Sequence, residues 1–362
     1  MAEKADEKYI RLALELAEKG RGKTSPNPLV GAVIVKSGRI VGQGYHRKAG
    51  TPHAEINALS DARENARGAS LYVNLEPCCH YGRTQPCTGE IIKAGVRKVI
   101  FSLRDPNPPV NGKGAAQLRK AGIRVRSGVL RKEAEQLNEV YLKFITTGRP
   151  FVILKTAQTF DGRIATGSGD SKWVTGSKAR KLVHRLRAEC DAVAVGAGTV
   201  RADNPSLTVR LMNGRNPYRL IVSTGLKFPR TISLFNDNDD AKTIVATVEN
   251  SARKLNVKNL IVWEIKKGKG GLSLDDFLDK AGQFGISSLL VEGGATLATS
   301  FIKSGLVDKH YIFLAPKVLG AGIEAVGNLN IRKMSDAIGY KSMAYIPGYE
   351  PDFLFIGYPE GK

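Results

Sequence analysis

The sequence predicts an α/β protein with two domains. Short β-branched runs of strand length alternate with amphipathic stretches of helix length along the chain, and this alternation is typical of a sheet covered by helices. The chain has 362 residues, whereas one domain commonly has about 150. The segment TTGRP at 146–150 follows a helical stretch and is a plausible boundary between two domains. We therefore assign residues 1–147 to a first domain and residues 148–362 to a second.

The first elements follow from local patterns. Residues 29–46 form two alternating apolar runs joined at 36–39, which predicts a hairpin in which Gly38 suits positive φ. Thr51 suits the N-cap of a helix with Pro52 at its first position. The N-terminal helix is predicted from apolar residues spaced on one face, which are Ile10, Ala13, Leu14 and Ala17.

The same alternation continues on both sides of this boundary. A helix is expected from about Cys87 to Ala94, ended by Gly95, and another over 133–145. Strands are expected within 70–77, 97–106 and 123–130. Beyond the boundary, strand–helix units resume at 151–157, 177–196, 218–224, 241–248, 259–265, 288–294 and 310–320.

Composition limits the kind of protein. With 42% hydrophobic and 25% charged residues the chain is globular. Its formal net charge of +21 favours anionic partners such as nucleic acid, phosphorylated metabolites or a phosphate-rich cofactor. The basic residues are scattered, so a lysine-rich surface explains the charge about as well. No N-terminal signal segment and no apolar run of about 18 residues is present. We expect a cytoplasmic protein without a membrane partner.

Three of the four cysteines lie in EPCCHYGRTQPCTGE at 76–90, downstream of HAE at 53–55. His53, Cys78 and Cys87 provide one imidazole and two thiolates, which hold Zn²⁺ tetrahedrally and leave one position for water. The metal lowers the pKa of that water to about 7. Glu55 stands two residues after the histidine and suits the proton carrier of a zinc deaminase.

Other assignments of this cluster are possible from the residues alone. Zinc deaminases usually have P-C-x-x-C, whereas eight residues separate Cys78 from Cys87. Cys79 is a poor ligand because adjacent side chains diverge. His80 is a rival fourth ligand, but it would close the site to water. A structural zinc knot is the alternative to catalysis, and the H-x-E pattern argues against it. Cys190 suits a small core residue.

The second half has no G-x-G-x-x-G, so a dinucleotide-binding Rossmann domain is poorly supported. SLLVEGGATLATSFI at 288–302 is a buried strand, two glycines and a helix, whose first N–H groups would face an anion such as a pyrophosphate. A tight strand-to-helix turn explains Gly293 and Gly294 about as well.

Four motifs together resemble the deaminase half of the bifunctional riboflavin-biosynthesis enzymes: SPNPLVGAVIV, HAEINAL, EPCCHYGRTQPC and RDPNPPVNGKG. The long loop between the cysteines is a mark of that group. The resemblance covers about residues 3–147 and implies a cytidine-deaminase-like fold with one Zn²⁺ per chain. It implies that Asn27 and His46 contact the substrate near its base, and that Arg83, Asp105 and Asn107 contact its ribose and phosphate. By composition alone, DPNP is also a turn sequence.

Residues 150–325 resemble the reductase half of the same enzymes, which has a dihydrofolate-reductase-like fold and uses NADPH. The matching stretches are LKTAQTFDGRIATGSGDSKWVTG, VGAGTVRADNPSLTVR, VEGGATLATSFI and APKVLGAG. The resemblance places Lys155 beside the reacting sugar carbon. It implies substrate contacts at Ser171, Arg187, Leu207, Arg210 and Glu292. It implies NADPH contacts at Ala157, Trp173, Thr199, Asp203, Gly294, Ala295, Thr296, Leu297, Ala298, Thr299 and Ser300.

Residue chemistry agrees with these roles. Hydride transfer to an open-chain sugar needs a proton source, which Lys155 could supply, and Arg187 and Arg210 can hold phosphate bidentately. Without the resemblance, Trp173 could equally be a core residue.

Three functions are compatible with these motifs. The first is a bifunctional enzyme that deaminates a phosphorylated diaminopyrimidine and then reduces its ribosyl chain, with no nucleic-acid partner and with a homo-oligomeric state expected. The second is a tRNA or nucleoside deaminase with an appended domain, although such enzymes usually have the short cysteine spacing. The third is a non-catalytic zinc-stabilised binding module, against which Glu55 argues.

Overall fold

The computed structural model describes residues 2–81, 85–226, 228–229, 231–236, 242–248, 257 and 260–360. The chain divides into two compact units, Met1–Gly148 and Arg149–Lys362. The last helix of the first unit, α6 (Glu139–Thr147), ends where Gly148 adopts the left-handed conformation with φ 71°. Glycine tolerates this conformation without strain, so it is a common stop for a helix.

The first unit is built on a five-stranded sheet in the order β2-β1-β3-β4-β5. β1 pairs antiparallel with β2 and β3, and β3, β4 and β5 are parallel. Ser37 and Gly38 both have positive φ between β1 and β2, as a two-residue hairpin turn requires. The strands are β1 (Gly31–Lys36), β2 (Arg39–Tyr45), β3 (Ser70–Leu75), β4 (Lys98–Leu103) and β5 (Arg124–Ser127).

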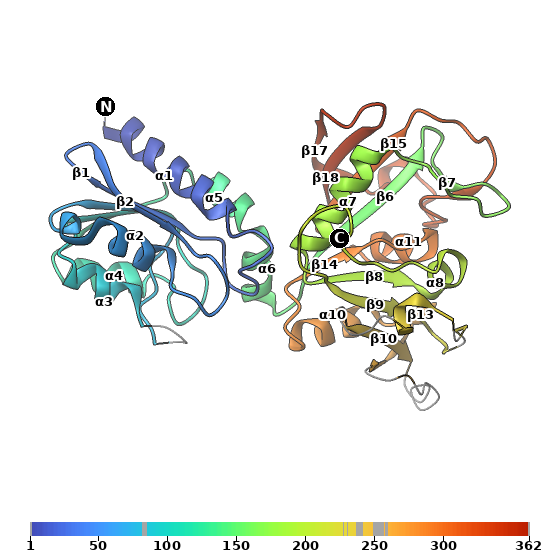
Figure 1. Ribbon diagram of the computed structural model, residues 1–362. Helices are drawn as coiled ribbons and strands as arrows, with labels where there is room; N and C mark the ends of the chain where they lie inside the picture. Colours follow the sequence, from blue (N-terminus) through green and yellow to red (C-terminus); the bar gives the residue numbers. More distant parts are fainter. Residues whose placement is uncertain are drawn as a thin grey trace. The chain divides into compact units, whose positions relative to one another are not determined.

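Helices cover both faces of this sheet (Figure 1). α1 and α5 pack on one face, and α2, α3 and α4 lie on the other. α2 approaches β2 closely because Gly44 has no side chain, and a Cβ there would lie 2.5 Å from the Ala58 nitrogen. The helices are α1 (Ala2–Glu18), α2 (Ala54–Ala62), α3 (Cys87–Lys93), α4 (Lys113–Lys120) and α5 (Arg131–Leu137), with a 3-10 turn at Arg63–Ala66.

Two local predictions are wrong. The helix expected to be capped by Thr51 begins at Ala54, with His53 as its N-cap, because the Thr51 hydroxyl donates to Lys48 O instead (2.7 Å). The single helix expected over 133–145 is two helices, α5 and α6, which meet at Asn138. The side chain of Asn138 bonds to a distant backbone segment, and this tertiary contact outweighs local helix propensity.

The second unit contains a nine-stranded sheet in the order β11-β10-β9-β8-β14-β6-β15-β18-β17, within the described residues. The strands from β11 to β15 are parallel, whereas β18 and β17 form an antiparallel edge. The strands are β6 (Phe151–Thr159), β8 (Ala192–Gly196), β9 (Tyr218–Val222), β10 (Thr243–Val248), β11 (Ile261–Ile265), β14 (Ser288–Val291), β15 (Lys309–Ala315), β17 (Tyr340–Ile346) and β18 (Phe353–Pro359).

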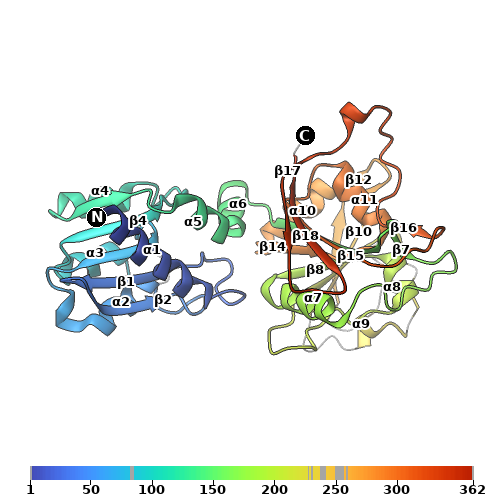
Figure 2. The same cartoon turned by 90° about the horizontal axis from the view of Figure 1, so that it is seen from above.

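Helices also pack against this second sheet (Figure 2). α10 and α11 contribute Phe277 and Phe301 to one buried apolar cluster, and α7 packs Val183 against Phe313 and Leu354 in another. The helices are α7 (Ser177–Glu189), α8 (Ala197–Asp203), α9 (Ser233–Asn236), α10 (Leu274–Gln283) and α11 (Ala295–Lys303), with a 3-10 turn at Met334–Asp336. Two small ribbons pair β12 (Lys267–Gly268) with β13 (Gly271–Leu272) and β7 (Arg163–Ala165) with β16 (Ile323–Glu324).

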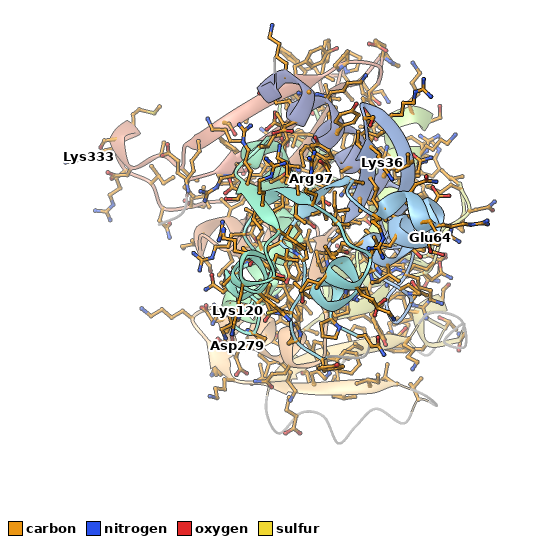
Figure 3. All side chains as sticks on the ribbon, turned by 90° about the vertical axis from the view of Figure 1, so that its left-hand side faces the viewer. Lys36, Glu64, Arg97, Lys120, Asp279 and Lys333 are labelled. Atoms are coloured by element: carbon orange, nitrogen blue, oxygen red, sulfur yellow. The ribbon has the colours of Figure 1, made fainter. Side chains whose placement is uncertain are left out.

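Charged side chains are spread over the surface (Figure 3). Lys36, Arg97 and Lys120 are exposed on separate elements or turns of the first unit. Among the described residues, no helix has the length and apolar character needed to cross a membrane.

Candidate functional site

The three predicted metal ligands come together in the first unit. His53 is the N-cap of α2, Cys87 is the first residue of α3, and Cys78 lies between β3 and α3. His53 Nδ1 is 3.2 Å from the Cys87 sulfur and 3.5 Å from the Cys78 sulfur. The three ligand atoms all lie within 4.8 Å of one another. One imidazole and two thiols at this spacing form a donor set for tetrahedral Zn²⁺ with a fourth position for water.

The neighbouring residues do not belong to this cluster. Cys79 directs its thiol to Pro109 O (3.5 Å). Within the part of the chain that the structure describes, the candidate metal group includes neither Cys79 nor His80. A hydrogen bond from Cys87 and the nearby His53 imidazole lower the pKa of Cys78 to about 4. The same hydrogen bond raises the pKa of Cys87, so without metal the pair holds a thiolate at Cys78 and a thiol at Cys87. One histidine and two cysteines at this spacing fit zinc, which binds cysteines as thiolates.

Glu55 is buried in the first turn of α2, beside the ligand cluster. Burial raises the pKa of Glu55 to about 7, and its carboxyl also has a hydrogen bond with Cys87. A bound Zn²⁺ would lower this pKa, because a nearby cation favours the carboxylate. A buried carboxyl that titrates near neutral pH can take up and release a proton during a reaction.

Asn27 and His46, the predicted base contacts, bond to each other next to the ligand cluster. His46 Nδ1 faces Pro52 O (3.3 Å) and must carry the proton, so His46 Nε2 accepts from the Asn27 amide (3.1 Å). The His46 and His53 rings meet edge to face, with their centroids 5.4 Å apart. Burial lowers the pKa of His46 and favours the neutral ring that this pairing needs.

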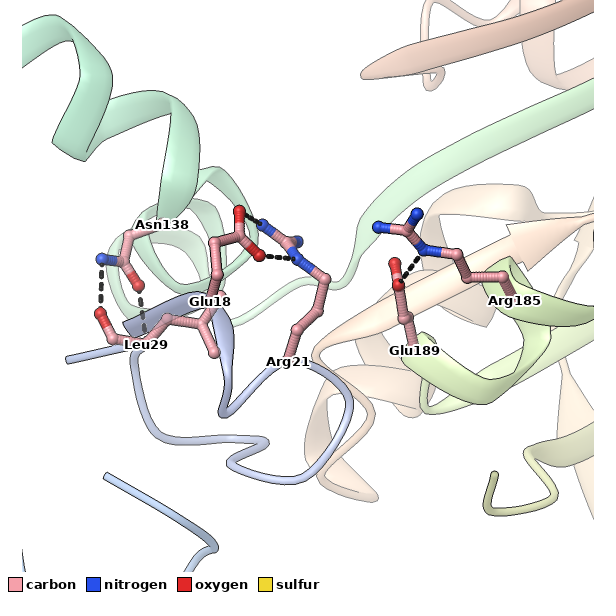
Figure 4. Close-up of polar contacts among 6 residues, drawn as sticks. All are labelled: Glu18, Arg21, Leu29, Asn138, Arg185 and Glu189. Atoms are coloured by element: carbon pink, nitrogen blue, oxygen red, sulfur yellow. Dashed lines mark hydrogen bonds and ion pairs between the residues drawn. The ribbon is translucent and has the colours of Figure 1, made fainter. Parts of the chain in front are cut away.

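Two buried asparagines hold the chain that follows Asn27. The Asn138 side chain accepts from Leu29 N (2.8 Å) and donates to Leu29 O (3.0 Å), as Figure 4 shows. Asn74 also donates to Leu29 O (2.8 Å) and accepts from Gly31 N (2.8 Å). Sequence reasoning missed both residues. The sequence could have singled out Asn74, because it is a polar residue inside the apolar run SLYVNL.

Asn138→Ala should destabilise the first unit by about 1–3 kcal/mol, because a buried backbone N–H loses its partner. We also expect a higher KM for the deaminase substrate, because the loop that carries Asn27 loses an anchor. Urea unfolding and initial-rate measurements check both effects. The exposed Asn65→Ala is the matched control. An unchanged KM in a clearly destabilised variant would show that Asn138 has only a structural role.

Two of the other predicted substrate contacts of this unit, Asp105 and Asn107, lie in one turn and bond to each other. Asp105 is buried just beyond β4, and its Oδ1 accepts from the Tyr141 hydroxyl (2.8 Å) and from Asn107 N (2.9 Å). Burial raises the pKa of Asp105. These bonds set the DPNP turn, which brings Asp105 and Asn107 together. Arg83 lies outside the described residues.

The second unit has a cleft of about 1700 Å³ at the carboxyl ends of β8, β9 and β14. Ligands of open α/β sheets bind at this edge. Among the predicted contacts, the residues that line the cleft are Lys155, Ala157, Ser171, Thr199, Asp203, Glu292, Gly294, Ala295, Thr296, Leu297 and Ser300.

The remaining predicted contacts lie elsewhere. The Ala298 side chain is packed in the apolar core instead of facing the cleft. Thr299 donates to Ala295 O and accepts from Gly327 N (2.6 and 2.7 Å). Leu207 is buried. Trp173 is 64% exposed with the Arg180 guanidinium over its ring, so the alternative of a core tryptophan is wrong.

Lys155 faces one acidic partner in the cleft, Glu292. Its Nζ lies 3.9 Å from Glu292 Oε2, and Arg187 bonds the same carboxylate through two nitrogens at 2.6 and 2.9 Å. Burial opposes ionisation of Glu292, but Arg187 and Lys155 outweigh it and lower the pKa of Glu292. In the structure the Arg187 guanidinium therefore bonds to Glu292, and it does not have both nitrogens available for a phosphate.

Arg210 is exposed, and its backbone is held by a histidine. Its backbone N–H donates to His184 Nδ1 (3.0 Å). Burial and the nearby arginines lower the pKa of His184 to about 4, so the ring is neutral and able to accept this bond. Arg210 is not among the residues that line the cleft, so its predicted contact with the substrate stays a prediction.

The N-terminus of α11 opens into the same cleft. Gly294 is its N-cap and donates its backbone N–H to Thr199 Oγ1 (3.1 Å). Gly293 packs so tightly that a Cβ would lie 2.7 Å from the Leu297 Cβ. The free N–H groups of this helix end attract negative charge. A large cleft that ends at a helix N-terminus fits a phosphate-bearing cofactor such as NADPH.

Comparison with known proteins identifies the family. The model of the cytidine and deoxycytidylate deaminase zinc-binding region matches residues 3–103, and that of the RibD C-terminal domain matches residues 150–344. The chain is 46% identical over 341 residues to the riboflavin biosynthesis protein RibD of Aquifex aeolicus, covering 93% of this chain and 94% of that protein. The chain belongs to the RibD family.

Other relatives agree with this assignment. Escherichia coli RibD is 41% identical, with 93% of this chain and 95% of that protein covered. The solved structure of Acinetobacter baumannii RibD matches with a TM-score of 0.89 at 38% identity, over 99% of both chains. A Thermotoga maritima structure, described as a diaminohydroxyphosphoribosylaminopyrimidine deaminase/5-amino-6-(5-phosphoribosylamino)uracil reductase, matches with a TM-score of 0.87 at 37% identity, over 99% of this chain and 100% of that chain. The resemblance stated from the motifs and the two-part α/β fold class of RibD proteins are confirmed.

Proposed function

We propose that this chain catalyses two consecutive reactions of riboflavin biosynthesis. The first is hydrolytic deamination of 2,5-diamino-6-ribosylamino-4(3H)-pyrimidinone 5′-phosphate, and the second is NADPH-dependent reduction of the ribosyl chain to ribityl, which gives 5-amino-6-ribitylamino-uracil 5′-phosphate. RibD relatives that match nearly the full chain support both reactions. The observation that carries the proposal is the cluster of His53, Cys78 and Cys87 with buried Glu55 beside it, in the same chain as the Lys155 cleft.

In the deamination, His53, Cys78 and Cys87 would hold one Zn²⁺. When bound, the metal supplies the nucleophile by lowering the pKa of water to about 7. Glu55 takes one proton from the attacking water and delivers it to the ring nitrogen. It then takes the second proton, from the hydroxyl newly bound to the ring carbon, and delivers it to the amine, which leaves as ammonia while the carbon–oxygen double bond forms. Asn27 and His46 orient the pyrimidine next to Glu55. Cys79 and His80 have no part in this chemistry.

In the reduction, the cleft between β6 and the N-terminus of α11 would hold NADPH and the open-chain sugar. NADPH, when bound, supplies the hydride. Lys155 supplies the proton that the sugar heteroatom gains as its carbon is reduced. Glu292 keeps Lys155 charged, since the attraction of a carboxylate opposes the effect of burial, which lowers the pKa of Lys155. Arg187 holds Glu292 in place for this role.

Lys155→Ala should lower NADPH oxidation by about 10²- to 10⁴-fold, because the reduction loses its proton donor. Ammonia release from the diaminopyrimidine should stay normal, since the deaminase residues lie in the other unit. The assay follows NADPH absorbance and ammonia in parallel, first with the diaminopyrimidine and then with its deaminated product. The exposed Lys181→Ala is the matched control.

Glu292→Gln should have the same pattern of effects as Lys155→Ala, because a neutral amide cannot hold the lysine charged. Two results would overturn the two-site proposal. One is the loss of ammonia release in Lys155→Ala. The other is a wild-type enzyme that never oxidises NADPH with the deaminated product.

A further inference from the structure

A buried carboxylate, Glu76, stands immediately before the Pro77-Cys78 pair. Its Oε2 accepts from Gly112 N and its Oε1 accepts from Ala115 N, both at 2.9 Å. These are backbone donors at the start of α4, a helix end that has no cap from its own side chains. Glu76 therefore caps α4 from another part of the chain, and the cap ties the Cys78 segment to that helix.

A second contact joins α4 to the segment that contains Cys87. Thr88, the residue after Cys87, is fully buried on α3 and donates its hydroxyl to the Gln117 side chain on α4 (2.8 Å). Its backbone N–H donates to Cys78 O (3.1 Å). α3 and α4 lie side by side beneath the sheet (Figure 1). Both cysteine-bearing segments are thus anchored to one helix through residues adjacent or nearly adjacent to the cysteines.

Close packing completes the anchor. A Cβ at Gly114, in the first turn of α4, would lie 2.1 Å from Pro77 O and 3.3 Å from Glu76 Oε1. Only glycine lets the helix approach the Cys78 segment this closely, and the peptide at Pro77 has no room to shift toward α4. The Glu76 cap and this close packing therefore both set where the Cys78 segment lies relative to α4.

We propose that α4 is a brace that sets the separation of Cys78 and Cys87, with Glu76 and Thr88 as positioning residues for the metal. The proposal rests on the zinc site of the proposed function. Residues outside the ligand set commonly orient the ligands, and their loss weakens metal binding by about 10- to 100-fold. The Glu76 and Thr88 contacts hold the two cysteine segments in place on α4 before the metal arrives.

Glu76→Gln and Thr88→Val test the brace. A glutamine at 76 turns one of its two acceptors into a donor that faces a backbone N–H, and a valine at 88 keeps the volume of threonine without its hydroxyl. Each variant should bind zinc about 10- to 100-fold more weakly in chelator competition and release it correspondingly faster. Thr88→Ser should restore affinity. The exposed Glu133→Gln and Thr146→Val are matched controls and should bind zinc like the wild type.

A second readout separates positioning from stability. The visible spectrum of the Co²⁺-substituted protein reports ligand geometry, and it should change in Glu76→Gln and in Gly114→Ala, which alters no polar group. If all three variants keep wild-type zinc affinity and Co²⁺ spectra, the brace is wrong even where their thermal stability falls. If the wild type itself binds no zinc, the proposed function fails instead.

Discussion

Glu55→Gln is expected to lower the turnover number of deamination by about 10²- to 10⁴-fold while the protein keeps its zinc. The amide has the shape of the carboxyl but cannot accept the proton of the attacking water. Glu55 is not one of the three clustered ligands, so metal binding should survive the change. Ammonia release and zinc content are measured on the same preparation.

The exposed Glu64→Gln, just beyond α2, is the matched control and should have wild-type activity. NADPH oxidation with the deaminated product should be unaffected in both variants. A near-normal rate of deamination in Glu55→Gln would remove the proton carrier from the proposed mechanism. It would also favour the alternative in which zinc only stabilises the fold.

Cys78→Ser and Cys87→Ser should each lose zinc and with it all measurable deamination. A serine hydroxyl stays protonated at neutral pH and is a far weaker ligand than a thiolate, which leaves two donors where a stable site needs three. Cys79→Ser should keep both zinc and activity, since the Cys79 thiol is directed to Pro109 O. Metal analysis after dialysis and ammonia release check the three variants side by side.

This series has an internal control, because the same substitution is made at two neighbouring positions. Equal zinc loss in all three variants would contradict the ligand assignment. Reduction of the deaminated product should persist in each variant, since Lys155 and its cleft belong to the other unit. Loss of that activity would indicate general unfolding and not metal loss.

Much of the candidate deaminase site was open to prediction because its chemistry is local. His53 and Glu55 are two residues apart, and each cysteine of the cluster follows a proline, so short motifs carry the donor types and their order. The α/β class was predictable for the same reason, since strand and helix periodicity are properties of neighbouring residues. Most of the reductase contacts came from the resemblance, because in 148–362 only the glycine turn at 293–294 gave a local signal, that of an anion site.

Contacts between distant residues decided the rest. Pairing of Glu292 with Arg187 joins residues 105 positions apart, and Asn138 reaches Leu29 across 109 positions. Nothing near these residues in the chain shows which buried polar group will meet which partner. Burial requires each such group to find a partner, and the packing of whole elements selects it.

By itself the sequence determined the two-part α/β fold class, the residue types of the candidate metal site and the family. Only the tertiary structure decided that Arg187 bonds a carboxylate, that Trp173 is exposed, and that Glu76 joins the Cys78 segment to α4. Local periodicity and motifs depend on near neighbours, whereas the free energy of a buried polar contact depends on groups that meet only after the chain has folded.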